Sequence, residues 1–280
     1  QKWSLPIKGQ ISEAALVGPT LAILMRDAGH KLGDGFSRVT LIDTATGQEA
    51  TILSVRFEAQ NLGVDPDHMR LFVGNGGDGS VSVIDMDKKF VTKTIDVANS
   101  AAGVGVDTKT GTRYILNRLG GSEIYSWPKD SQGLIRMEAG KWPSELVVDV
   151  NRRTLIALSH YESALYLWNL DNPTTYETFS LGVAHNTGDS LGDLAYDADA
   201  GVAAVVFTET GNVVVADVAN KKILMTTNFP ELNIGPNSGP DGAKIAVDGT
   251  KNQIYIYDSK GAAVRAYNYT SGQLVATIAL

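Results

Sequence analysis

The chain has 280 residues, 43% of them hydrophobic and 20% charged, which suits a globular protein with a sizeable core. Its formal net charge is −7, and adjacent basic residues occur only at three predicted turns: Lys88-Lys89, Arg152-Arg153 and Lys221-Lys222. Because it has no basic stripe, we expect no nucleic-acid partner. No apolar run approaches the roughly 18 residues that a membrane span requires, so we expect no membrane insertion.

Cysteine is absent, which excludes disulfides, thiolate metal ligands, cysteine nucleophiles and covalently attached haem. The chain begins at Gln1 and not at methionine, which favours a processed mature form or a domain of a larger protein. An acidic, cysteine-free chain of this kind fits an exported protein. We therefore expect it in the periplasm, outside the cell or at the cell surface.

In chain order, short apolar runs alternate with turn residues from one end to the other. Residues 2–8 (KWSLPIK) predict an extra N-terminal strand, and Gly18-Pro19 breaks the stretch 12–27, which could otherwise form a helix. Strands are then predicted at 60–65, 69–74, 80–86 and 90–97. Groups of this size cover residues 10–55, 60–97, 101–138, 143–181, 190–228 and 242–280.

Two sequence landmarks repeat in step. The first is an apolar strand with an acidic end, at Asp65, Asp107, Asp149, Asp197 and Asp248, in steps of 42, 42, 48 and 51 residues. The second is a strand such as VTLID or VSVID, which ends at Asp43, Asp85, Pro128, Asn169, Asp217 and Asn268. A period of roughly 40–50 residues with four short strands is typical of one propeller blade. We therefore predict an all-β fold, a β-propeller of four-stranded antiparallel blades in one domain over residues 1–280.

The stretch RLFVGNGGDGSVSVIDMDKKFVTKTIDV (70–97) resembles the YVTN type of β-propeller repeat, with poorer copies at 114–127 and 213–227 and a half copy at 263–280. This resemblance covers nearly the whole chain and implies the architecture. It implies little about activity, because one fold serves many functions. The glycines of GNGGDGS (74–80) match no phosphate-binding motif and predict a tight hairpin. Trp127 and Trp168 occupy matching strand positions and predict packing between blades.

Six complete groups predict six blades. The N-terminal strand 2–8 is then surplus, because the last group already ends with its own fourth strand, QLVATIAL. The alternative is a seven-bladed propeller whose last blade is incomplete in this chain.

If the strands of a blade are labelled a to d, the a–b and c–d turns lie at one end and the b–c and d–a connections at the other. At the a–b/c–d end, we interpret four strand-ending side chains as bonding to turn amides: Asp43, Asp85, Asp217 and Asn268. The b–c/d–a end carries longer connections at 26–36, 181–190 and 227–242. Long loops on a rigid scaffold tend to hold binding residues, so we place the site at this end.

Three of the four histidines fall at the b–c/d–a end, and His68 falls at the other. The ligand-binding candidates at the b–c/d–a end are His30, His160, His185, Glu162, Glu209 and Asp258. Imidazole and carboxylate groups suit Zn²⁺, but no His-x-His or similar spacing is present, and solvated loop histidines are the alternative interpretation. A resemblance to lactonase-type propellers would instead imply Ca²⁺ held by Glu, Asn and Asp. The metal candidates are His30, His160, His185, Glu58, Asn99, Glu138, Asn186 and Asp241.

The clear repeat, with no catalytic signature such as Gly-x-Ser-x-Gly, predicts a non-catalytic binding or interaction module. Its ligand, a protein or a small molecule, is expected at the b–c/d–a end. The first alternative is a metal-dependent, lactonase-like or other hydrolase with one Ca²⁺ or Zn²⁺ ion. The second is a quinoprotein-like or electron-transfer propeller.

Overall fold

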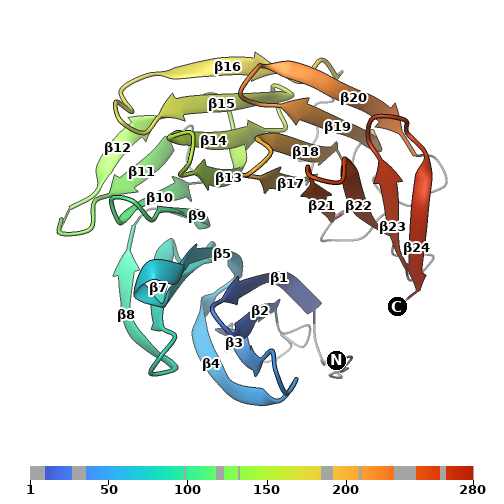
Figure 1. Ribbon diagram of the computed structural model, residues 1–280. Coiled ribbons are helices and arrows are strands. Elements are labelled where there is room, and N and C mark those ends of the chain that lie inside the picture. Colours follow the sequence, from blue (N-terminus) through green and yellow to red (C-terminus); the bar gives the residue numbers. More distant parts are fainter. Residues whose placement is uncertain are drawn as a thin grey trace. The chain divides into compact units, whose positions relative to one another are not determined.

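A computed structural model describes residues 10–26, 36–97, 99–117, 123–131, 133–183, 192–207, 210–229, 244–258 and 263–279. These residues form six four-stranded antiparallel sheets (Figure 1). This is the architecture of a six-bladed β-propeller, so the predicted fold class is confirmed. The sixth sheet has all four of its strands, which argues against an incomplete last blade. The predicted strand 2–8 lies outside the described residues.

The chain divides into two compact units, residues 1–138 and 139–280. The first unit holds three sheets: β1 (Gln10–Val17), β2 (Thr20–Arg26), β3 (Phe36–Asp43) and β4 (Glu49–Phe57); β5 (Ala59–Asp65), β6 (Arg70–Asn75), β7 (Ser80–Asp85) and β8 (Phe90–Asp96); and β9 (Ala101–Asp107), β10 (Thr112–Asn117), β11 (Glu123–Trp127) and β12 (Ile135–Glu138). A short 3₁₀ turn, η1 (Pro66–His68), links β5 to β6.

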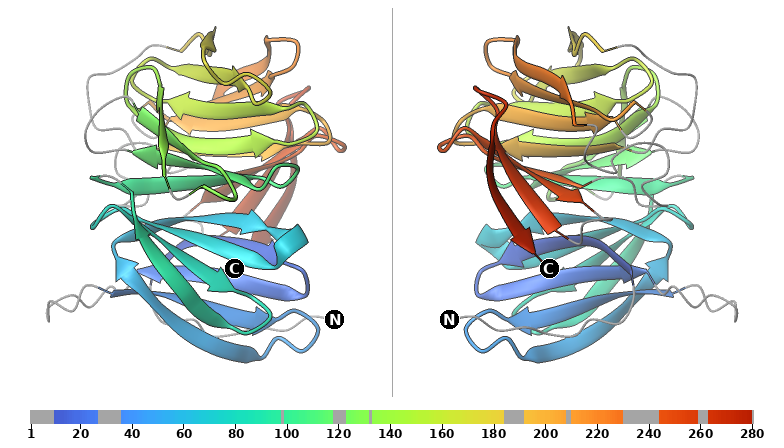
Figure 2. Two further views of the ribbon diagram at one scale, coloured as in Figure 1. Left: turned by 90° about the vertical axis from the view of Figure 1, so that its left-hand side faces the viewer. Right: turned by 90° about the vertical axis from the view of Figure 1, so that its right-hand side faces the viewer.

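The second unit holds the other three sheets: β13 (Pro143–Asp149), β14 (Thr154–Ser159), β15 (Ala164–Asn169) and β16 (Tyr176–Ser180); β17 (Gly192–Asp197), β18 (Val202–Phe207), β19 (Asn212–Asp217) and β20 (Lys222–Asn228); and β21 (Ile245–Asp248), β22 (Gln253–Asp258), β23 (Ala263–Asn268) and β24 (Leu274–Ala279). Within every sheet the four strands lie side by side in chain order (Figure 2). No helix in the described part of the chain is long and apolar enough to cross a membrane.

Asx side chains hold the turns at the a–b/c–d end, as predicted. Asp43 Oδ1 accepts hydrogen bonds from the amides of Ala45 and Thr46, both at 2.9 Å. The same arrangement recurs after the third strand of other sheets, where Asp85, Asp217 and Asn268 accept from turn amides. A carboxylate or amide that caps a turn in this way satisfies backbone donors that would otherwise need water.

The apolar core lies between neighbouring sheets within each unit. One cluster joins the second and third sheets, where Phe72 meets Trp127 edge-on with ring centroids 6.4 Å apart. The predicted packing of Trp127 between blades is therefore confirmed. Trp168 is also buried, but its aromatic contacts are with Tyr166 and Tyr176 of its own sheet.

Polar side chains on the first strand of a sheet bond to the first strand of the next sheet. We call each such contact an edge latch: the side-chain oxygen accepts from a main-chain N–H that no strand on that side satisfies. The described residues contain three, Glu13 to Leu62 N at 2.6 Å, Asn61 to Val104 N at 2.7 Å and Asp193 to Ile245 N at 2.8 Å. Each latch lies within one unit and fixes the register of two adjacent sheets.

The glycine cluster at 74–80 serves packing and turn geometry. A Cβ on Gly74 would lie 2.5 Å from the Ala101 carbonyl oxygen of the next sheet, so no larger residue fits. Gly79 has a φ of +71°, in the left-handed region that glycine adopts without strain. The prediction of a tight hairpin between β6 and β7 is confirmed.

Candidate functional site

Several predicted site residues lie outside the described part of the chain: His30, His185, Asn186, Glu209 and Asp241. Of Asp258 only the backbone is described, as the last residue of β22. The ligand and metal roles assigned to these residues stay predictions.

Three oxygen-donor candidates belong to the first unit. Glu58 lies between β4 and β5, Asn99 between β8 and β9, and Glu138 at the end of β12, and all three are exposed. Within the described ranges, no three His, Asp or Glu side chains gather closely enough to hold a metal ion. A metal site therefore stays a prediction that depends on residues outside those ranges.

His160 is placed in the b–c turn between β14 and β15, as predicted, but it is not a solvated loop residue. Its side chain is 5% exposed, and its ring meets Phe207 of the next blade edge-on, with centroids 5.5 Å apart. Ser144 Oγ donates to the Leu158 carbonyl oxygen at 3.1 Å and lies 2.5 Å from His160 Nδ1. The contact with Ser144 and the packing against Phe207 hold the imidazole ring in one orientation.

Gly192 makes room for this histidine. A Cβ at Gly192 would lie 1.7 Å from His160 Nε2 and 2.4 Å from the Val206 carbonyl oxygen. The imidazole thus fills the space above a glycine at the start of β17. This environment gives His160 a packing role between the fourth and fifth blades, and its role as a ligand stays a prediction.

Glu162 lies beside His160 in the sequence and faces a different set of groups. Its Oε2 accepts a short hydrogen bond from the Tyr166 hydroxyl, and its Oε1 lies 3.7 Å from Lys141 Nζ. Burial, followed by the hydrogen bond to Glu162, raises the pKa of Tyr166. The carboxylate therefore has one buried partner, Tyr166, and one exposed partner, Lys141.

Beside these groups lies a feature that the sequence did not predict, an exposed pair of aromatic rings. Trp142 is 60% exposed and Tyr161 41% exposed, and their rings are near-parallel, with centroids 6.4 Å apart and an interplanar angle of 24°. Lys141 Nζ lies 5.9 Å from the centroid of the Tyr161 ring. We call Trp142 and Tyr161 the aromatic platform.

The backbone at the aromatic platform is unusual. Trp142 has a φ of +51°, a left-handed conformation that is rare for a bulky residue, and it precedes Pro143, which restricts it further. The only sequence signal was the tripeptide Lys-Trp-Pro in a d–a connection. That Tyr161 lies beside it depends on the register of β13 against β14, in which Pro143 is opposite Ser159.

The chain matches no family model and no curated protein. Among solved structures it is similar to hydrazine synthase of Kuenenia stuttgartiensis, with a TM-score of 0.72, 18% identity, and coverage of 100% of this chain and 90% of that one. A likeness at this identity shows the fold alone, and it supports the propeller architecture. Since 1409 chains of solved structures match this one, the fold does not select a function.

Proposed function

We propose that this chain is a non-catalytic binding module, and that it docks a protein partner through the b–c/d–a end of its fourth blade. The observation that carries the proposal is the exposed aromatic platform at that end. Tryptophan and tyrosine supply most of the binding energy in protein interfaces, where they act as rigid anchors surrounded by polar groups. Lys141 and Glu162 supply such a polar rim.

The strained backbone supports this interpretation. A left-handed residue other than glycine or asparagine lowers stability by about 1–2 kcal/mol, and Trp142 gains little in return because most of its ring is in solvent. An exposed aromatic residue held in an unfavourable conformation is a feature associated with binding sites. We further propose that the repeat is of the YVTN type and that the protein is exported and acts at the cell surface or in the periplasm.

Substitution of Trp142 by glycine separates binding from folding. Glycine adopts a positive φ without strain, so W142G removes the anchor while the free energy of unfolding stays within about 1 kcal/mol of the parent. The matched control is Ile135→Ala, which truncates a residue of similar exposure, 58%, at the edge of another sheet.

The experiment is affinity capture from extracts of the producing cells with the parent, W142G and I135A proteins as bait. Proteins retained by the parent and by I135A but lost with W142G are identified, purified and titrated against each bait. We expect a loss of affinity of at least 10-fold for W142G, the size that a hot-spot residue gives. A partner that binds W142G as tightly as the parent, or the absence of any Trp142-dependent partner, would overturn the proposal.

A further inference from the structure

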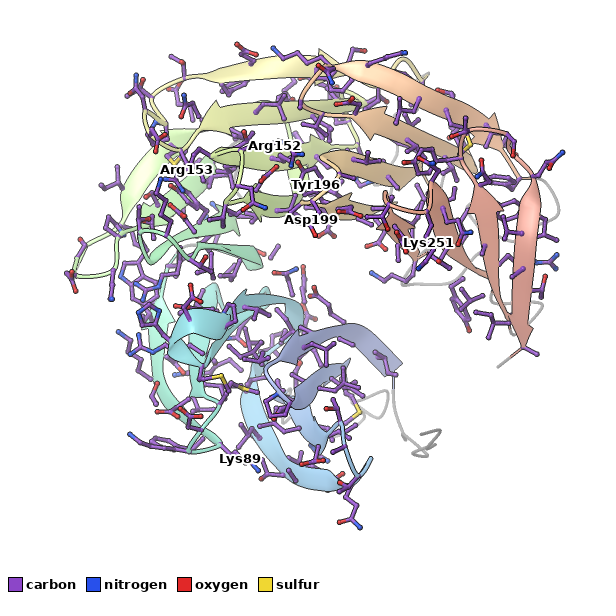
Figure 3. The ribbon with its side chains drawn as sticks, in the orientation of Figure 1. Lys89, Arg152, Arg153, Tyr196, Asp199 and Lys251 are labelled. Carbon is purple, nitrogen blue, oxygen red and sulfur yellow. The ribbon has the colours of Figure 1, made fainter. Side chains whose placement is uncertain are left out.

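A cavity lies between the fourth and fifth blades, at the a–b/c–d end and therefore at the opposite end from the aromatic platform. Three of its lining residues, Arg152, Arg153 and Tyr196, are labelled in Figure 3. Its volume is about 750 Å³, which is within the range of small-molecule sites, roughly 300–1,000 Å³. Three of its lining side chains are cationic, Arg152, Arg153 and Lys221, and one is anionic, Glu177. Each of the three cations has a carboxylate partner, and the cavity is distinguished by the cations that two different blades contribute to its lining.

The basic pair Arg152-Arg153 and one lysine of a second pair, far away in the sequence, meet at this cavity. Arg153 belongs to the a–b turn of the fourth blade, and Lys221 to the c–d turn of the fifth. Both stand four residues after a strand-ending aspartate, Asp149 and Asp217 respectively. The repeat therefore brings one cation from each blade to the same place.

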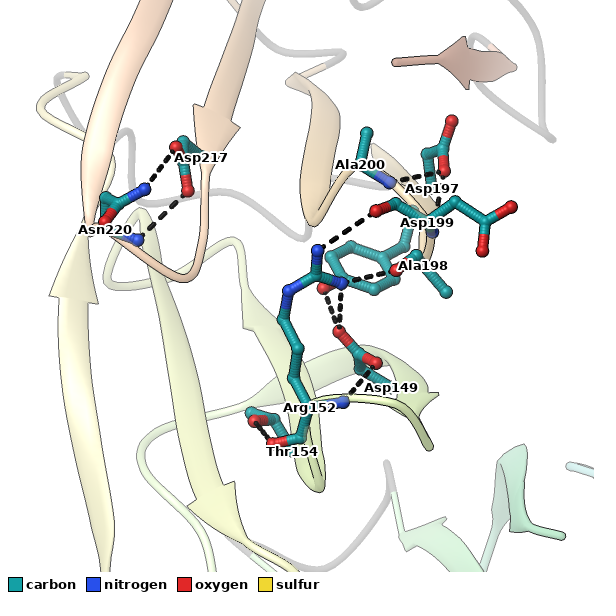
Figure 4. Close-up of polar contacts among 10 residues, drawn as sticks. Asp149, Arg152, Thr154, Asp197, Ala198, Asp199, Ala200, Asp217 and Asn220 are labelled. Carbon is teal, nitrogen blue, oxygen red and sulfur yellow. Dashed lines mark hydrogen bonds and ion pairs between the residues drawn. The ribbon is translucent and has the colours of Figure 1, made fainter. Parts of the chain in front are cut away.

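The Arg152 guanidinium bonds to groups of its own blade and of the next one (Figure 4). Its Nη1 donates to Asp149 Oδ2 at 3.1 Å, and its two terminal nitrogens also donate to the carbonyl oxygens of Ala198 and Asp199. The Asp149 side chain is fully buried and also accepts from the Tyr196 hydroxyl at 2.5 Å. Arg152 is a positioning residue, because its guanidinium is already occupied by the next blade.

The two remaining cations pair with carboxylates at the surface. Arg153 Nε lies 3.0 Å from Asp171 Oδ1, and Lys221 Nζ pairs with Glu177. The side chains of Asp171 and Glu177 are 63% and 67% exposed, but Arg153 is only 14% exposed whereas Lys221 is 47% exposed, so water screens the Lys221 pair more than the Arg153 pair. An incoming anion can therefore displace Glu177 from Lys221 at little expense and compete with Asp171 for the Arg153 guanidinium.

The backbone at Arg153 and Lys221 takes the left-handed conformation that recurs in the turns at this end, where Met69 and Asn252 also adopt it. Both residues have a positive φ, +55° and +50°. Turns elsewhere at this end place Gly47, Gly111, Gly201 or Gly272 in this conformation, which glycine adopts without strain. Lys89 is a further cation with a positive φ, at the matching turn position of the second blade, and it does not line this cavity.

We propose that this cavity binds the carboxylate or phosphate group of a small organic anion between Arg153 and Lys221. The polar groups of Thr154, Asn169 and Asn172 line the same cavity and are placed to contact the body of the ligand. This site is independent of the protein-docking function, because it lies at the other end of the blades.

The test measures the melting temperature and the dissociation constant of citrate and of inorganic phosphate, with sodium chloride at matched ionic strength as the blank. The parent protein is expected to gain about 2 °C or more at saturating citrate or phosphate. R153Q and K221Q are each expected to weaken binding at least 10-fold. K89Q, the matched control, should bind within about twofold of the parent, because Lys89 has the same turn position without the cavity.

A fourth variant keeps the test decisive if R153Q or K221Q does not fold. Glu177→Gln removes the carboxylate that competes for Lys221, so E177Q should bind the anion severalfold more tightly than the parent. No citrate- or phosphate-dependent shift in the parent would overturn the site, and so would an equal loss of binding in K89Q and K221Q. Unchanged or weaker binding in E177Q would also contradict it.

Discussion

The fourth blade presents different chemistry at its two ends. At the b–c/d–a end, exposed aromatic rings lie beside a histidine that is packed against the next blade. At the a–b/c–d end, charged side chains line a cavity, and one of them, Arg152, is anchored on the buried carboxylate of Asp149. Strands β13 to β16 separate the two, so one scaffold holds an apolar anchor and a charged site apart. Recognition can therefore differ between the two ends of a blade while the strands that connect them stay the same.

The largest expected effect tests how tightly the b–c/d–a end is packed. Gly192→Ala places a methyl group within 2.4 Å of two atoms, one of them a backbone oxygen that cannot move aside. We expect the free energy of unfolding to fall by about 3 kcal/mol, measured by denaturant titration. The control is Gly133→Ala, where the nearest atom would be 4.0 Å away, and which should leave stability unchanged. A neutral G192A would show that His160 is loosely held.

The next effect tests the buried carboxylate at the other end. Asp149→Asn leaves Arg152 without its ion-pair partner and weakens the acceptor for Tyr196, so we expect a loss of about 3 kcal/mol in denaturant titration. Asp171→Asn removes the largely exposed carboxylate that pairs with Arg153 and should lower stability by at most about 1 kcal/mol. Equal effects of the two changes would remove the distinction between anchoring and replaceable charges.

A smaller effect tests the a–b/c–d end through the pH dependence of the stability of the fold. Burial, followed by the hydrogen bond to Asp149, raises the pKa of Tyr196. The neutral phenol is therefore favoured in the folded state, and this stabilisation is fully present below pH about 10, the ordinary value for tyrosine. It is lost as the pH rises through the raised folded value. Tyr196→Phe should lower stability by about 1 kcal/mol at neutral pH and flatten the alkaline decline of the melting temperature, and an unchanged alkaline decline would contradict this account.

The smallest effect concerns Asp248, the partly exposed counterpart of Asp149 in the last blade. The side-chain hydrogen bond from Lys251, followed by that from Thr250, lowers the pKa of Asp248 to about 2. Its contribution is present above the ordinary carboxyl value of about 3.9 and is lost as the pH falls from there to about 2. Asp248→Asn should make the melting temperature fall slightly less as the pH is lowered from about 3.9 to about 2. A loss of stability as large as that of D149N would show that burial is not what separates the two positions.

The fold could be predicted from the sequence because the repeat depends on contacts between residues that are close together in the chain. Strand-ending aspartates such as Asp43 and Asp85 bond to amides two or three residues on, so both partners are adjacent in the chain. The glycines that set the b–c hairpin at 74–80 are also local. Features of this kind follow from turn rules that hold in any protein.

The candidate sites were harder to predict because their partners are distant in the sequence. From the sequence, His160 could be interpreted as a solvated loop histidine. The structure shows that Gly192, in the next blade, makes room for its ring. The cavity needs Arg153 and Lys221 from two blades, and their basic pairs look scattered in the sequence. The aromatic platform requires the register of β13 and β14 to bring Trp142 to Tyr161.

The edge latches give the chain a direction of assembly. In all three, the side-chain acceptor comes first in the sequence and the amide that it binds follows 49, 43 or 52 residues later. At a translation rate of about 5–20 residues per second, each acceptor on a growing chain waits roughly 2–10 seconds for its donor. Water must solvate the carboxylate or amide of one blade until the first strand of the next is made. Folding during synthesis is therefore expected to advance blade by blade from the N-terminus within each unit, with every finished blade offering a template for its successor.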